Sequence, residues 1–338
     1  MLAYVLAMAV IAAGAANAAT LINGAGATFP FPLYAAWFNV YARVDPSVEF
    51  TYQAIGSGEG IKQITAQTVD FGASDKPLSD AELQAAAASG GKLLHIPTVM
   101  GAVVLTYHLP GITKGLKLKP EAVTDIYLGK ITRWNDKRIA DDNPGIKLPD
   151  QPIHVVHRAD GSGTTSIFTN YLCSVSSEWA KMVGTGVSVN WPVGFAGKGN
   201  DGVATKIVVT KYSIGYVELA YAFKNMLPYA SLKNRSGYFV APSIKSTIAA
   251  AAGAAMNMPA DYRITLVNQP GKDAYPIVGF TYLLVYKHQK DAVKGKKLVG
   301  FLSWGLNEGQ KIAPELLYAP LPPNVAKMVE ETIKTIKY

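Results

Sequence analysis

The sequence predicts an α/β protein divided into two lobes, and three observations lead to this prediction. The chain has 338 residues, more than one hydrophobic core usually supports, so two units with a cleft between them are favoured. The composition, with 49% hydrophobic and 17% charged residues, is that of an ordinary globular protein. Short strand-like runs alternate with stretches of helical periodicity, which is typical of an α/β fold.

The predicted elements follow this alternation along the chain. The first expected helix carries Leu33, Trp37 and Tyr41 on one face, at helical spacing. Helical stretches separate several of the strands, and the alanine-rich residues 247–255 are expected to form a surface helix. The expected strands are residues 21–22, 48–54, 99–107, 153–157, 213–217, 262–267 and 277–286.

Residues 1–18 are interpreted as a secretory signal peptide. They carry no charge, contain an apolar stretch over about residues 2–13, and end in the small-x-small pattern Ala16-Asn17-Ala18. The apolar run is shorter than the ~20 residues that span a bilayer, so a permanent anchor is the weaker alternative. The single cysteine, Cys173, has no partner for an internal disulfide. We therefore expect a soluble periplasmic protein, cleaved after about Ala18.

Charge and motifs exclude several function classes. The net charge of +8 suits an anionic ligand, but Lys and Arg are spread thinly, so no nucleic-acid partner is expected. The chain lacks the P-loop, the zinc-protease motif and a complete dinucleotide-binding motif, and neither Ser57 nor Ser162 stands in G-x-S-x-G. The histidines show no metal-ligand spacing. The sequence predicts a protein that is not an enzyme, with no cofactor and no metal.

Three loops share one design: a strand-like run, a tight segment of glycine with serine or threonine, and the start of a helix. They are residues 23–30, 55–60 and 156–164. Thr28 and Ser57 stand at the first two helix starts and Ser162 at the third, where unpaired N–H groups and the helix dipole favour an anion. Each hydroxyl alone could be an ordinary N-cap. Repetition of the design favours a small oxyanion site.

The third loop also contains Arg158 and Asp160. A guanidinium offers planar donors for a bidentate contact with an oxyanion, and Asp160 could hold it in position. The alternative is a structural ion pair. The helix start beside this pair favours the ligand-binding interpretation.

Several long motifs stand out along the chain. They are GAGATFPFPLYAAW, YQAIGSGEGIKQI, TVDFGASDKPLSD, DIYLGKITRWND, HRADGSGTTSIFTNYL, GKGNDGVA and IGYVELAYA. In sequence and in order they resemble one known family, the phosphate-binding component of bacterial phosphate ABC transporters, and the resemblance extends from about residue 22 to the C-terminus.

This resemblance implies a two-lobed periplasmic binding protein fold of type II, with a doubly wound sheet in each lobe and the ligand in the cleft between them. Lobe one would combine residues 19–98 with 276–338, and lobe two would be residues 99–275. The chain would cross between lobes near residues 97–101 and 276–279.

The resemblance also implies a set of phosphate ligands. In this sequence they fall on Thr28, Phe29, Ser57, Asp70, Arg158, Ser162, Gly163 and Thr164, with Asp160 orienting Arg158. An ionised Asp70 would accept a hydrogen bond only from an anion that still carries a proton, as phosphate does at neutral pH and sulfate does not. Glu59 stands where the family often has glycine, and a carboxylate facing the cleft would repel the anion.

The implied function is capture of inorganic phosphate outside the cytoplasmic membrane and its delivery to an ABC-type permease, by a protein expected to be a monomer. Two alternatives remain open. One is a binding protein for another tetrahedral oxyanion, such as sulfate or molybdate. The other is a secreted phosphatase with Ser57 or Ser162 as nucleophile, although no base or metal motif supports it.

Overall fold

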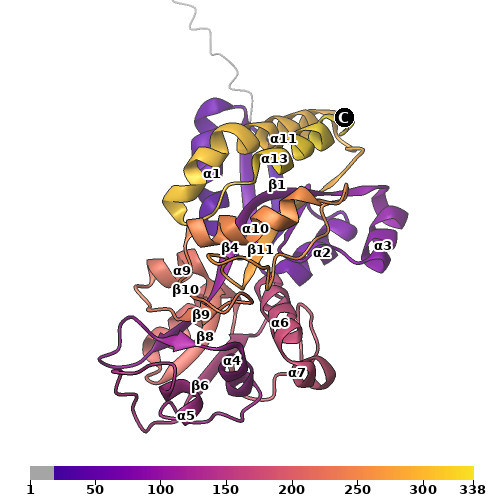
Figure 1. The fold of residues 1–338 in the computed structure, drawn as a ribbon. Helices are drawn as coiled ribbons and strands as arrows, with labels where there is room; N and C mark the ends of the chain where they lie inside the picture. The colour runs from indigo at the N-terminus through magenta and orange to yellow at the C-terminus, as the bar shows by residue number, and fades with distance from the viewer. Residues whose placement is uncertain (1–18) are drawn as a thin grey trace, which may run out of the picture.

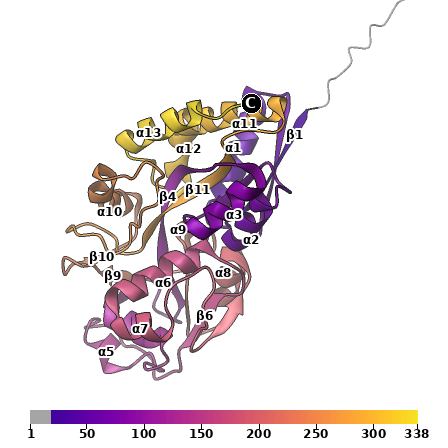
Figure 2. The same cartoon turned by 90° about the vertical axis from the view of Figure 1, so that its right-hand side faces the viewer.

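The structure is a computed structural model that describes residues 19–338, so the predicted signal peptide lies outside the described residues. It confirms the two-lobed α/β fold. Figures 1 and 2 show the lobes one above the other, with the long strands β4 (Leu93–His108) and β11 (Val278–Tyr286) running between them. Among the described residues, none of the helices combines the length and the apolar character that a bilayer crossing would need.

One eight-stranded sheet extends through both lobes in the order β2-β1-β3-β11-β4-β8-β6-β7. Lobe one is built on β1, β2, β3 and β11, and lobe two on β6, β7 and β8. Within each lobe the shorter strands are parallel, whereas β11 and β4 run antiparallel to their neighbours. The shorter strands are β1 (Thr20–Gly26), β2 (Val48–Ala54), β3 (Phe71–Ser74), β6 (His154–Arg158), β7 (Phe195–Gly197) and β8 (Ser213–Glu218).

Helices follow most of these strands and cover the sheet. Those that begin at the cleft are α1 (Phe31–Val44), α2 (Ser57–Thr65), α6 (Gly163–Val175), α8 (Gly199–Val209) and α9 (Leu219–Lys224). The others are α3 (Asp80–Gly90), α4 (Pro120–Tyr127), α5 (Lys137–Ala140), α7 (Ser177–Met182), α10 (Ile244–Met256), α11 (Ala292–Trp304), α12 (Gln310–Ile312) and α13 (Pro323–Lys334), with a π turn at Gly305–Gly309 and a 3-10 turn at Ala313–Leu316. A small second sheet joins β5 (Lys117–Leu118), β9 (Ser231–Lys233) and β10 (Phe239–Val240).

Strand β4 belongs to both lobes. It pairs with β11 up to Ala102 and with β8 from Val103 onward, without a break in the strand. Every residue of β4 before its last is buried, so it has the continuous apolar pattern of a strand covered on both faces. The division at residues 98/99 and 275/276 stays a prediction.

One expected strand, residues 262–267, is wrong. The segment is irregular, and Tyr262 and Asn268 at its ends have positive φ values of 60° and 52°, which regular strands do not adopt. Leu266 and Val267 are nevertheless buried. A loop that packs apolar side chains into the core thus produces the same sequence pattern as a short strand.

Candidate anion-binding site

The loops between strands and helices bring most of the predicted ligands together at the cleft. Loops after β1 and β2 supply Thr28 and Ser57 from lobe one, and the loop after β6 supplies Arg158, Ser162 and Thr164 from lobe two. All five residues are buried. Parallel strands place these loops at their carboxyl ends, which is where α/β sheets bind ligands.

The two lobes touch each other through these loops. The backbone N–H of Gly163 donates to Ser57 Oγ at 3.1 Å, and the N–H of Gly58 donates to the carbonyl of Gly161 at 2.9 Å. The Tyr221 hydroxyl, at the start of α9, donates to the Thr28 carbonyl at 2.6 Å. The structure is therefore a closed form of the cleft.

Arg158 is held in the orientation that the sequence suggested. Its Nε donates to Asp160 Oδ1 at 2.8 Å, its Nη2 donates to Oδ2, and its Nη1 donates to Thr164 Oγ1 at 3.3 Å. Burial raises the pKa of Asp160, but the ion pair with Arg158 outweighs it and keeps that pKa below its usual value. Asp160 also accepts the Gly199 N–H at 2.8 Å, so it ties the guanidinium to the start of α8.

The structure places Asp70 outside this cluster. Its carboxylate accepts the N–H of Asn23 at 2.8 Å and pairs with Lys294 Nζ at 2.9 Å. Asp70 precedes β3, whereas the cleft lies at the carboxyl end of that strand. The whole length of β3 separates Asp70 from the cleft, so Asp70 stabilises the loop at the opposite end of this strand.

Asp75, which the sequence interpretation missed, is a second carboxylate inside the cluster, beside Asp160. It follows β3 directly, and its Oδ1 accepts the Thr281 hydroxyl at 2.7 Å. Its Oδ2 lies 3.5 Å from Ser57 Oγ. Burial raises the pKa of Asp75 to about 7, against the opposing effects of the Thr281 hydrogen bond and the positive charge of Arg158. Its place after a strand, in the motif GASD, was the signal that could have identified it.

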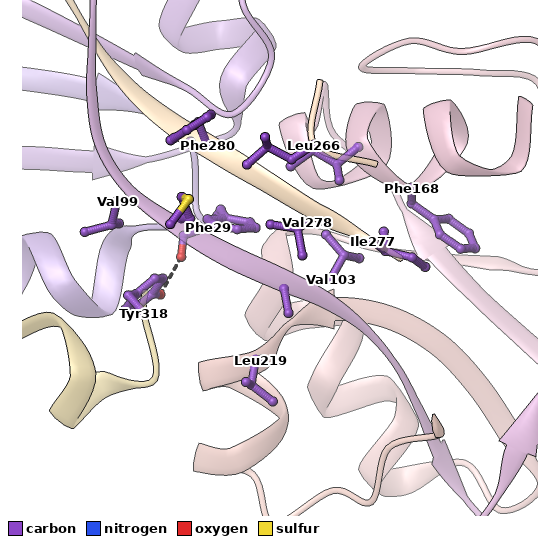
Figure 3. Close-up of a cluster of buried hydrophobic side chains, with 14 of the residues drawn as sticks. Phe29, Val99, Val103, Phe168, Leu219, Leu266, Ile277, Val278, Phe280 and Tyr318 are labelled. Atoms are coloured by element: carbon purple, nitrogen blue, oxygen red, sulfur yellow. Dashed lines mark hydrogen bonds between the residues drawn. The ribbon is translucent and has the colours of Figure 1, made fainter. Parts of the chain in front are cut away.

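Ser57, Ser162 and Phe29 differ in which of their groups can contact a ligand. Ser57 Oγ accepts the N–H groups of Asp75 at 3.2 Å and Gly163 at 3.1 Å. Ser162 caps α6 by accepting the Thr165 N–H at 3.0 Å, as an ordinary N-cap does. The ring of Phe29 is fully buried, and its carbonyl accepts the Tyr318 hydroxyl at 2.6 Å (Figure 3), so only its backbone N–H can face an anion.

Glu59 turns away from the cleft. Its carboxylate lies 3.4 Å from Gln63 Nε2 and 3.7 Å from Lys62 Nζ, both on its own helix α2. Its exposed carboxylate is therefore solvated and does not repel an anion bound among the buried loops.

The cluster combines many donors with one acceptor. Helices α2, α6 and α8 begin beside it, Arg158 supplies a buried positive charge, and Asp75 supplies a carboxylate that forms no salt bridge among the described residues. Such a set suits a small oxyanion that carries a proton. Among the described residues, no group of three or more His, Cys, Asp or Glu side chains could hold a metal ion.

A cavity of about 550 Å³ lies at the edge of the cluster, where the two lobes meet. It is lined by Thr28 and Asp160 and by two lysines of lobe two, Lys198 and Lys224. Asp160 and Asp201 balance these two lysines, so the lining has no net positive charge and the positive charge of the cluster itself comes from Arg158.

The chain is similar to known proteins along most of its length. The model of the PBP superfamily domain matches residues 12–308. The phosphate-binding protein PstS of Pasteurella multocida is 46% identical over 318 residues, 94% of this chain and 91% of its own. The phosphate-binding protein PstS of Haemophilus influenzae is 42% identical over 333 residues, 98% of this chain and 97% of its own.

Solved structures show the same fold. The phosphate-binding protein from Stenotrophomonas maltophilia superposes with a TM-score of 0.70 at 22% identity, covering 93% of this chain and 94% of that one. A high affinity periplasmic phosphate-binding protein bound with phosphate gives a TM-score of 0.71, also at 22% identity, with 92% and 93% of the two chains covered. At this identity the likeness supports the fold alone.

Proposed function

Because the chain belongs to the PstS family of phosphate-binding proteins, we propose that it captures inorganic phosphate in the cleft between its lobes and delivers it to the permease of an ABC transporter. The observation that carries this proposal is the buried donor cluster around Asp75 and Arg158. The protein acts in the periplasm, as a monomer, and holds the anion without changing it.

The proposed phosphate ligands are those expected from the sequence, except that Asp75 replaces Asp70. Phosphate oxygens accept from Arg158, from hydroxyls and from backbone N–H groups at the helix starts, and the aspartate that faces the ligand is Asp75 in place of Asp70. The remaining ligands are Thr28, the backbone of Phe29, Ser57, Ser162, Gly163 and Thr164, with Asp160 orienting Arg158.

Asp75 explains how phosphate is chosen over sulfate. At neutral pH phosphate carries at least one proton, so one of its oxygens can donate to the carboxylate. Sulfate has no proton to give, and its oxygens would face the lone pairs of a buried carboxylate without compensation. A sulfate or molybdate protein would have no use for this acceptor.

The contacts of the two serines disfavour the phosphatase alternative. Among the described residues, the hydrogen-bond partners of Ser57 are Asp75 and Gly163, and the partner of the Ser162 hydroxyl is the Thr165 N–H. Neither hydroxyl contacts a histidine that could remove its proton. The site holds an anion but lacks an activated nucleophile.

Titration calorimetry on protein stripped of bound anion tests the proposal. We expect one phosphate per chain and no comparable binding of sulfate at neutral pH, and a chromogenic phosphate ester should not be hydrolysed. Equal affinity for both anions would refute phosphate selectivity, and ester hydrolysis that is lost in Ser57→Ala would establish the enzyme instead.

A further inference from the structure

Asn200 is a fully buried residue at the start of α8 that contacts predicted ligands from both lobes. Its Nδ2 donates to Thr28 Oγ1 at 2.8 Å and to Thr164 Oγ1 at 3.2 Å. Its backbone N–H also lies 3.3 Å from Thr28 Oγ1. One side chain thus connects the hydroxyl of lobe one with that of lobe two.

The orientation of the Asn200 amide is fixed by the backbone of β8. The N–H of Glu218 donates to the Asn200 side-chain oxygen at 2.9 Å. A backbone N–H can only donate, so the amide atom facing it must be the oxygen. The NH₂ group therefore points to the two threonines and cannot be exchanged with the oxygen.

This arrangement decides how both threonine hydroxyls are used. Thr28 Oγ1 accepts from the amide and the backbone of Asn200, and Thr164 Oγ1 accepts from Asn200 and from Arg158 Nη1 at 3.3 Å. A hydroxyl has two acceptor positions and one O–H. With both acceptor positions occupied, each threonine must offer its O–H elsewhere, and within residues 19–338 neither has a protein acceptor for it.

We propose that Asn200 is a positioning residue for anion binding: it forces the Thr28 and Thr164 hydroxyls to act as donors toward the ligand and thereby couples closure of the lobes to the loading of the site. This inference rests on the proposed function, because the ligand that accepts the hydrogen bonds of both hydroxyls is phosphate. Hydroxyls already oriented as donors need no reorientation when the anion arrives.

Replacing Asn200 by aspartate tests the inference. Asn200→Asp keeps the shape of the side chain but presents acceptors to both threonines, so their protons turn away from the ligand. We expect the dissociation constant for phosphate to rise at least about 100-fold. The matched control is Asn307→Asp, the same change at an exposed position in lobe one, which should leave phosphate affinity unchanged.

A double-mutant cycle separates this role from simple charge repulsion and from a structural role. Thr28→Val removes the hydroxyl but keeps the shape, so in that background Asn200→Asp should cost at least about fivefold less affinity than in the wild type. All variants are measured by calorimetry with inorganic phosphate, and their unfolding temperatures without phosphate are compared. If Asn200→Asp does not fold, Asn200→Ala in the same cycle tests the same coupling.

The outcomes are distinct. Strong coupling between the two substitutions supports the inference. Phosphate binding with additive losses overturns the inference and leaves the proposed function intact. Wild-type protein that fails to bind phosphate refutes the proposed function, and the inference fails with it.

Discussion

At the scale of single residues, the selectivity of the site depends on the carboxylate of Asp75. Asp75→Asn keeps the shape but adds N–H donors that can face an unprotonated oxygen, so sulfate should gain affinity relative to phosphate. We expect the phosphate-to-sulfate affinity ratio to fall by at least about tenfold, or roughly 1.4 kcal/mol. Paired calorimetry of both anions at constant pH and ionic strength measures this ratio.

Asp70→Asn is the matched control for this prediction. Asp70 pairs with Lys294 away from the cluster, so its replacement should leave the anion ratio unchanged. If the ratio fell for Asp70→Asn but not for Asp75→Asn, Asp70 would be the selective carboxylate and our assignment to Asp75 would be wrong.

The same carboxylate links pH to stability in the ligand-free protein. Burial raises the pKa of Asp75 to about 7, above its value of about 3.9 in an unfolded chain, so the folded protein retains a proton that the unfolded chain has already released. Folding stability is therefore lost as pH rises from about 4 to about 7. Asp75→Asn removes this loss.

Chemical denaturation at pH 5 and pH 8 measures the effect. The free energy of unfolding of Asp75→Asn, relative to wild type, should be larger at pH 8 than at pH 5 by about 2 to 3 kcal/mol. An equal difference at both pH values would show that Asp75 titrates normally in the folded protein.

Most of the binding cluster could be predicted at residue level, and the exceptions have physical reasons. Arg158 and the hydroxyls of the three loops carry local signals, namely glycine, small polar residues and the start of a helix. Asp75 carries no such signal by itself, because only its position after β3 distinguishes it from Asp70. Asn200 was missed because its partners come from other loops, one of them in the other lobe.

At the scale of elements, closure depends on how closely α6 can approach lobe one. A Cβ on Gly163, the first residue of α6, would lie 2.5 Å from both Ser57 Oγ and Asp75 Oδ2. Gly163→Ala should therefore hinder closure and weaken phosphate binding by about 10- to 100-fold, the range expected for overpacking. The ligand-free protein should unfold at the same temperature or higher, since alanine favours helix.

Gly253→Ala is the control for this substitution. Gly253 lies in α10, and a Cβ there would meet no atom within 4 Å. Calorimetry with phosphate should show wild-type affinity for Gly253→Ala. Unchanged affinity in Gly163→Ala as well would mean that the ligand-bound lobes stand further apart than in this structure.

Helices and strands could be predicted where the apolar residues within the segment itself show a helical or strand period. The expected strand at 99–107 is the second part of β4, and the expected helix at 247–255 is α10. The first part of β4, residues 93–98, was not among the expected strands, and the irregular segment at 262–267 was wrongly expected to be one, because the conformation of both segments depends on what packs against them.

At the scale of the whole molecule, strands β4 and β11 run between the two lobes. Gly101 of β4 and Gly279 of β11 are paired in the sheet, and Cβ atoms there would overlap the side chains of Phe29 and Ile167. Figure 3 shows Phe29, Val103 and Ile277 gathered around this crossing. Apolar side chains therefore pack closely where these strands pass between the lobes. The family resemblance placed the crossings near residues 97–101 and 276–279, but the packing of Phe29 and Ile167 against them depends on contacts between distant segments.

The crystal structure of the protein with phosphate is the most direct test of the central claim. We predict one phosphate between the lobes, with an oxygen within hydrogen-bonding distance of Asp75 and others on Arg158 and the Thr28 and Thr164 hydroxyls. Phosphate bound outside this cluster, or a complex in which Asp75 does not touch the anion, would contradict the account.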